Sequence, residues 1–106
     1  MTDREYLIDN LSPDEICAQL AEECAELAQA ALKLRRSRAA DNPTPVSETE
    51  ALDGITEELA DVYCCIDLAI EALKLSAFEI ISIANFKKTR WPKGSEMCRR
   101  RLTDAA

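Results

Sequence analysis

Acidic residues recur at a spacing of three in two separate parts of this chain. The first group reads EECAE from Glu22 to Glu26, and the second reads ELAD from Glu58 to Asp61. On a helix, residues three apart lie on one face with their Cβ atoms about 5–6 Å apart, so Glu23 pairs with Glu26 and Glu58 pairs with Asp61. Two such pairs facing each other across antiparallel helices would present four carboxylates. Carboxylates are ligands for hard cations, so the pattern predicts a magnesium site, at which manganese is a possible substitute.

The residues around the first group place one of its acids where apolar side chains are expected. An α-helix turns by 100° per residue, and at this rotation four aliphatic positions form a narrow stripe. Glu23 falls inside the stripe, Glu26 lies at its edge, and Glu22 lies further round the helix. The stripe consists of Ile16, Leu20, Leu27 and Leu34. An ionised carboxylate among leucines is costly unless it is paired or coordinates a metal.

The second group sits on a helix that is apolar on two sides. Its main stripe consists of Ile55, Leu59, Tyr63, Ile66, Ile70 and Leu73, and a nearly opposite stripe of Cys65, Leu68 and Ala72 is continued by Glu58 and Asp61. A helix with two apolar faces is typical of the centre of a bundle. By contrast, Asp53, Asp67 and Glu71 lie on the remaining edge and are expected to be solvated.

The competing interpretation is a solvated helix face, because glutamate is common on exposed helices and either motif alone is a weak signal. Two acid pairs that both intrude on apolar stripes favour the metal site instead. The chain contains no histidine and no CxxC pair, which argues against a zinc site and against the Glu-x-x-His pattern of di-iron bundles. Cys17, Cys24, Cys64 and Cys65 are expected to be reduced, small apolar residues.

Three serines followed three residues later by glutamate mark helix starts: Ser12 with Glu15, Ser47 with Glu50, and Ser76 with Glu79. They predict helices over about 12–37, 47–75 and 76–90. The proline-containing segment 38–46 reads as a loop, and a Trp-Pro-Lys-Gly sequence at 91–94 ends the last helix.

Length and composition predict one all-α domain over residues 1–106, with a core at 12–92 and a basic tail at 93–106. The 106 residues include only two glycines and four prolines, which leaves few turns for a β-structure. We expect a helical bundle of three to four helices per chain. A chain this short buries a modest core alone, so we expect a homodimer or homotetramer that completes a four-helix bundle.

Charge and hydropathy restrict the expected partners. Residues 1–85 carry 6 basic and 18 acidic side chains, whereas residues 86–106 carry 7 and 2, so a basic tail follows an acidic body. This acidity makes nucleic-acid binding unfavourable. The sequence has no apolar run long enough for a membrane span and no signal pattern, so we expect a cytoplasmic protein without membrane association.

These motifs resemble those of the MazG-like, all-α nucleoside triphosphate pyrophosphohydrolase superfamily. Its pattern is Glu-Glu-x-x-Glu, a spacer, Glu-x-x-Asp, and then Asn-x-Lys-x-x-Arg, which residues 85–90 (NFKKTR) fit before Trp91 and Pro92. The resemblance spans about residues 12–92. The spacer is somewhat long because of the 38–46 loop, which leaves the substrate more open than the metal site.

The resemblance implies magnesium-dependent hydrolysis of ribo- or deoxynucleoside triphosphates to monophosphates and pyrophosphate, a nucleotide-pool housekeeping reaction. It implies Glu23, Glu26, Glu58 and Asp61 as metal ligands and Glu22 as an outer-shell group or base. Asn85, Lys87 and Arg90 would contact phosphates or sugar, and Trp91 would either pack or stack on the base. Two alternatives stay open: an enzyme like phosphoribosyl-ATP pyrophosphohydrolase, and a non-enzymatic helical oligomer that serves as a binding module.

Overall fold

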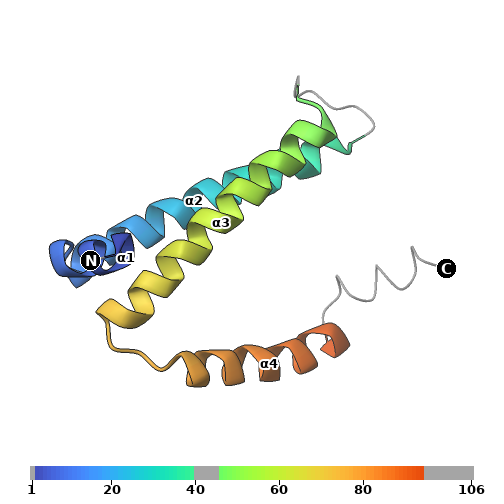
Figure 1. The fold of residues 1–106 in the computed structure, drawn as a ribbon. Helices are drawn as coiled ribbons and strands as arrows, with labels where there is room; N and C mark the ends of the chain where they lie inside the picture. The colour runs from blue at the N-terminus through green and yellow to red at the C-terminus, as the bar shows by residue number, and fades with distance from the viewer. Residues whose placement is uncertain (1, 40–45, 95–106) are drawn as a thin grey trace. The chain divides into compact units, whose positions relative to one another are not determined.

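The chain folds into helices throughout the parts that the structure describes. The structure is a computed structural model, which describes residues 2–39 and 46–94, with side chains through residue 90. Within these ranges there are four helices and no strand: α1 (Asp3–Asn10), α2 (Pro13–Ser37), α3 (Glu48–Ala72) and α4 (Ala77–Gly94) (Figure 1). The all-α prediction is therefore confirmed. The chain divides into two compact units, Met1–Leu75 and Ser76–Ala106.

In the first unit, α2 and α3 run side by side in opposite directions (Figure 1). Each begins at the serine that the sequence indicated: the Ser12 Oγ accepts a hydrogen bond from the Glu15 amide, and the Ser47 Oγ accepts one from the Glu50 amide, both at 3.1 Å. These bonds satisfy amides that have no partner within the helix. The predicted hairpin of two long helices is therefore present.

The end of α3 comes three residues before the predicted Leu75 because the backbone reverses there. Lys74 adopts a left-handed conformation with φ of 55°. The Leu75 amide then donates to the Ile70 carbonyl at 2.8 Å, and the Lys74 amide donates to the Glu71 carbonyl at 3.2 Å. This pair of bonds is a Schellman motif, which closes the helix and satisfies its last carbonyls.

Helix α1 was not among the predicted helices. Its capping box is complete: the Thr2 Oγ1 accepts from the Glu5 amide at 3.1 Å, and the Glu5 carboxylate accepts from the Thr2 amide at 2.8 Å. Arg4 joins α1 to α3 through ion pairs with Asp67, at 2.6 Å, and with Glu71. Both acids are exposed as expected, but they are paired, and the Arg4 guanidinium lowers the pKa of Asp67.

The core of the first unit forms where α1, α2 and α3 meet. Ile16, Leu68 and Ala69 are buried, and partly buried apolar residues pack against them: Leu7, Ile8, Leu11, Leu20 and Ala72. This confirms the predicted buried face of α2. On α3, however, the stripe that includes Leu68 and Ala72 is the buried one.

The stripe that was expected to be the main apolar face of α3 is largely exposed. Tyr63 is 79% exposed, and Leu59, Ile66 and Leu73 are also exposed. The ranking of the two faces was wrong because a count of apolar residues does not tell which face meets the neighbouring helix.

The second unit contains α4, which Ser76 caps by accepting a hydrogen bond from the Glu79 amide at 3.1 Å. The helix runs four residues beyond the predicted end at Arg90. Pro92 lies in the last turn of this helix and has no backbone N–H to donate to it. The exposed large apolar side chains of α4 are Phe78, Ile80, Ile81, Ile83 and Phe86.

Two predicted segments fall mainly outside the described residues. These are the 38–46 loop, of which residues 40–45 are not described, and the basic tail, from residue 95 onward. Among the helices that the structure does describe, none has the length and apolar character needed to cross a membrane.

Candidate metal centre

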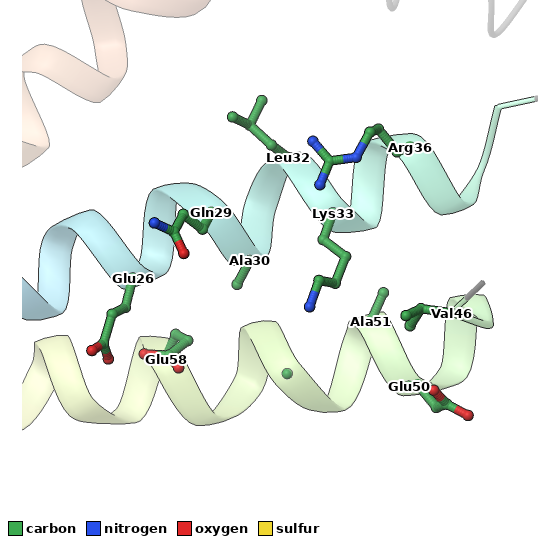
Figure 2. Close-up of a pocket in the computed structure, with 11 residues that line it drawn as sticks. Glu26, Gln29, Ala30, Leu32, Lys33, Arg36, Val46, Glu50, Ala51 and Glu58 are labelled. Carbon is green, nitrogen blue, oxygen red and sulfur yellow. The ribbon is translucent and has the colours of Figure 1, made fainter. Parts of the chain in front are cut away.

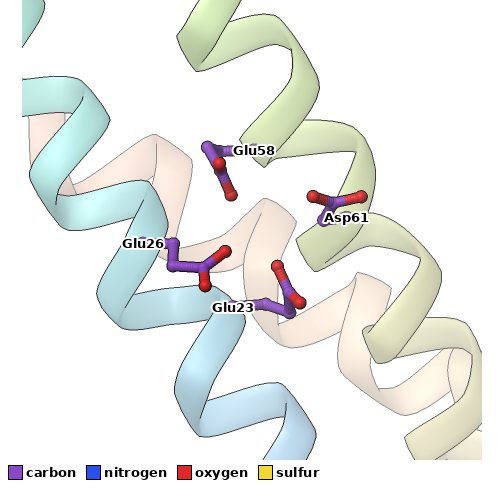
Figure 3. Close-up of side chains that lie close together, drawn as sticks. All are labelled: Glu23, Glu26, Glu58 and Asp61. Carbon is purple, nitrogen blue, oxygen red and sulfur yellow. The ribbon is translucent and has the colours of Figure 1, made fainter.

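Four carboxylates from two helices converge halfway along the α2–α3 hairpin. Glu23 and Glu26 extend from α2, and Glu58 and Asp61 extend from α3 toward them (Figure 3). One carboxylate oxygen from each residue lies within 4.8 Å of those of the other three. The structure thus brings together the four acids that the sequence singled out.

Helix geometry explains why these four meet. Each pair has the i,i+3 spacing that places two side chains on one face of a helix. The buried face of α2, which includes Ile16, turns Glu23 toward α3, and the buried face of α3, which includes Cys65, turns Glu58 and Asp61 toward α2. The apolar contacts that hold the hairpin together therefore also bring the acids together.

Two of these carboxylates have an oxygen without a partner. The Oε2 atoms of Glu23 and Glu58 are buried and accept no hydrogen bond from the described residues. Buried polar atoms are usually hydrogen-bonded, and leaving one unpaired is costly. A cation bound among the four carboxylates would give both oxygens a partner.

The electrostatics of Glu23 support this assignment. Burial raises the pKa of Glu23 above its ordinary value of 4.5, and the neighbouring carboxylates of Glu26 and Asp61 raise it further. The Gln19 amide opposes this effect by donating to the Glu23 Oε1 at 2.8 Å. Without a counterion the centre holds like charges close together, and a divalent cation would remove that repulsion.

The donor set fits a hard cation. All four candidate donors are carboxylate oxygens, which Mg²⁺ and Mn²⁺ accept. Cys65 is the buried thiol near the centre, and burial, followed by the charge of Glu23, raises its pKa. That thiol stays protonated near neutral pH, so it offers no thiolate to a softer metal.

A groove begins at the carboxylates and continues between α2 and α3 toward the loop that joins them (Figure 2). Its volume is about 830 Å³, and Glu26 and Glu58 belong to both the groove and the centre. The other residues that line it are Gln29, Ala30, Leu32, Lys33, Arg36, Val46, Glu50, Ala51 and Gly54. A cavity of this volume can hold a small molecule.

The remaining predicted site residues are Glu22 on α2 and four residues of α4, a helix of the second unit. Glu22 is exposed on α2 beside Glu23. Asn85, Lys87 and Arg90 are exposed on α4, in the second unit, where the Arg90 guanidinium lies 5.5 Å from the centre of the Phe86 ring. The side chain of Trp91 lies outside the described residues.

Three residues that shape the site were not predicted from the sequence, namely Gln19, Lys33 and Gly54. Gln19 stands four residues before Glu23, a spacing at which helical side chains hydrogen-bond, so a signal for it was present. Lys33 and Gly54 belong to the groove, which depends on how the two helices face each other. Periodicity along one helix does not reveal that register.

Comparisons with known proteins found no match to this chain among protein-family models, curated proteins or solved structures.

Proposed function

We propose that this chain is a magnesium-dependent nucleoside triphosphate pyrophosphohydrolase. The observation that carries the proposal is the set of four carboxylates, with buried, unpartnered oxygens on Glu23 and Glu58. The resemblance of the acidic motifs to the MazG-like superfamily supplies the reaction class. The groove that opens beside the centre supports it further, since a substrate needs space next to the metal.

In this proposal Glu23, Glu26, Glu58 and Asp61 hold magnesium, which supplies positive charge to the phosphates and makes water more acidic. Water adds to the phosphate chain, the bond between the α- and β-phosphates breaks, and nucleoside monophosphate and pyrophosphate leave. Glu22, exposed beside the centre, accepts the proton of the water. Gln19 holds Glu23 in place through its hydrogen bond. Asn85, Lys87 and Arg90 contact phosphates or sugar.

The proposal includes a homodimer or homotetramer that completes a four-helix bundle. Its support is the exposed apolar stripe on α3, which contains Leu59, Tyr63 and Ile66. Contiguous exposed apolar surface of this kind marks an interaction site. A second copy of the chain would cover it and stabilise the hairpin that carries the carboxylates.

The test is pyrophosphate release from a panel of ribo- and deoxynucleoside triphosphates, with magnesium and with a chelator. We expect magnesium-dependent release by the wild type and a loss of about 100-fold or more in Glu58→Gln, because a ligand becomes neutral without changing size. Glu57→Gln is the matched control: this exposed neighbour lies outside the centre and should leave the rate unchanged. Equal magnesium-dependent rates for the wild type and Glu58→Gln would refute the ligand assignment.

Two rival functions have distinct outcomes in the same experiments. An enzyme like phosphoribosyl-ATP pyrophosphohydrolase would release pyrophosphate from phosphoribosyl-ATP and leave the other triphosphates intact. A helical binding module would hydrolyse none of them, and magnesium would not raise its thermal unfolding midpoint.

A further inference from the structure

The groove between α2 and α3 is placed to receive whatever binds at the metal centre. Glu26 and Glu58 form its inner end, so a molecule bound at the carboxylates has this space directly beside it (Figure 2). Its lining includes acidic, amide, aliphatic and basic side chains. A purely apolar partner would leave these polar groups unsatisfied.

Gly54, in the second turn of α3, lines the groove. Gly54 lies inside a 25-residue helix, where glycine is less favourable than alanine. No turn requires it, since its φ is not positive, and a Cβ built on it meets no atom within 4 Å. Neither backbone conformation nor tight packing explains this glycine. Because Gly54 lines the groove, a large side chain at this position would take up space in it.

Lys33 brings positive charge into the same groove. It stands seven residues after Glu26, which is two helical turns and about 10 Å along α2. Its side chain extends from α2 toward α3, as does that of Glu26 (Figure 2). Side chains on a helix lean toward its N-terminus, so the ammonium of Lys33 leans toward the carboxylates. Lys33 makes no ion pair with any residue in the described ranges.

We propose that this groove binds the phosphate chain of the substrate and that the Lys33 ammonium contacts the phosphates farthest from the carboxylates. The inference rests on the proposed function and adds to it a phosphate-binding residue within the first unit. Hydrogen bonds from cations to phosphate are strong, and a metal held by the carboxylates would supply positive charge at one end of the groove while Lys33 supplies it further along α2. The ligand class is a triphosphate, either nucleoside-linked or inorganic.

The experiment measures binding of inorganic tripolyphosphate by calorimetry, with magnesium present, to the wild type and to four variants. Lys33→Gln should weaken binding roughly tenfold, because a charge-assisted hydrogen bond to phosphate is lost. Arg35→Gln removes one positive charge from the same helix outside the groove and should change affinity less than about twofold. Gly54→Leu should abolish binding by filling the groove, whereas Gly54→Ala should retain binding and raise the unfolding midpoint.

Magnesium binding is followed separately, through the shift that magnesium produces in the unfolding midpoint of each variant. Lys33→Gln and Gly54→Leu should keep that shift, since neither alters the carboxylates. If the shift persists but Lys33→Gln binds tripolyphosphate as the wild type does, or loses no more affinity than Arg35→Gln, the inference is overturned and the proposed function stands. Unchanged binding by Gly54→Leu overturns it likewise. Absence of any magnesium shift or tripolyphosphate binding in the wild type overturns both.

Discussion

Glu23 is the residue at which the stability of the fold and the proposed function make opposite demands. It lies on the buried side of α2, and one of its oxygens has no partner among the described residues. Its other oxygen accepts from Gln19, an arrangement that fixes the carboxylate rather than neutralising it. A residue chosen for stability alone would be apolar at this position, so the cost of Glu23 indicates a functional role.

The raised pKa of Glu23 predicts how the stability of the metal-free protein changes with pH. The folded-state pKa of Glu23 lies above its ordinary value of 4.5, so the folded protein binds this proton more tightly than the unfolded chain does. Its contribution to stability is full below the ordinary pKa and is lost as pH rises through the folded-state pKa. Between about pH 5 and about pH 8, with a chelator present, the wild type should therefore lose more stability than Glu23→Gln. Thermal unfolding midpoints of both proteins check this.

Asp67→Asn is the control for that pH series. The pKa of Asp67 is lowered by Arg4, so its contribution is present above its ordinary value of 3.8 and is lost only as pH falls below it. The difference in unfolding midpoint between Asp67→Asn and the wild type should therefore stay constant over the same pH range. With magnesium present, the thermal unfolding midpoint of the wild type should instead rise with pH, because protons compete with the metal for Glu23. Parallel curves for the wild type and Glu23→Gln in chelator would contradict the assignment.

The four acids could be predicted from sequence because each pair depends only on the period of one helix, and because the stripes with which they overlap are regular. The groove could not be predicted in this way. It arises where Gly54 and Ala51 of α3 face Ala30 and Lys33 of α2, and that facing depends on the register between the helices. Small residues within a helix pattern carry no signal of what lies across from them.

At the scale of the element, caps determine where each helix begins and ends. The serines at 12, 47 and 76 made three helix starts predictable, since a hydroxyl that accepts from an amide three residues on is a local feature. Thr2 and Glu5 carry the same signature, yet α1 was missed because eight residues show no apolar periodicity. Its position depends on distant contacts, such as Arg4 with Asp67, which lies 63 residues away.

The end of α3 allows a direct test of whether a cap determines where a helix ends. Lys74 occupies a left-handed conformation that costs a residue with a side chain about 1–2 kcal/mol, a cost that glycine avoids. Lys74→Gly should therefore raise the free energy of unfolding by about 1 kcal/mol, which urea denaturation would measure. Lys74→Ala keeps the strain and removes the same charge, so it should leave stability nearly unchanged. A loss of stability in Lys74→Gly would show that the Schellman motif is not formed.

At the scale of the whole molecule, the first unit buries few side chains for its length. Of the described residues, those buried are Ile16, Ala51, Val62, Cys65, Leu68 and Ala69. Short chains bury a small fraction of their surface. With a core of this size, the free energy gained by burial exceeds the cost of lost conformational entropy only slightly. Covering the exposed stripe of α3 with a second copy would remove further apolar surface from water.

If the proposed oligomer forms through the exposed stripe, its assembly should depend on Tyr63. Tyr63 is 79% exposed at the middle of the stripe, between Leu59 and Ile66. Tyr63→Lys would place a charge in the interface, where an unpaired ammonium is costly. We expect it to reduce the mass measured by light scattering to that of a smaller species and to lower the unfolding midpoint at equal protein concentration. Ala60→Lys is the matched control, since this exposed residue of α3 lies about 100° from the stripe and should leave the mass unchanged.

The mass of the wild type decides whether this interface exists, and the variants decide where it lies. A folded wild-type monomer would contradict the oligomer directly, while leaving the carboxylate centre intact, because all four acids come from one chain. An oligomer that survives Tyr63→Lys would place the interface elsewhere, for example on the apolar residues of α4 such as Phe78 and Ile81. If Tyr63→Lys yields a monomer that still shifts its unfolding midpoint with magnesium, assembly stabilises the hairpin without supplying metal ligands. That outcome would show that a single chain is sufficient to bind the ion.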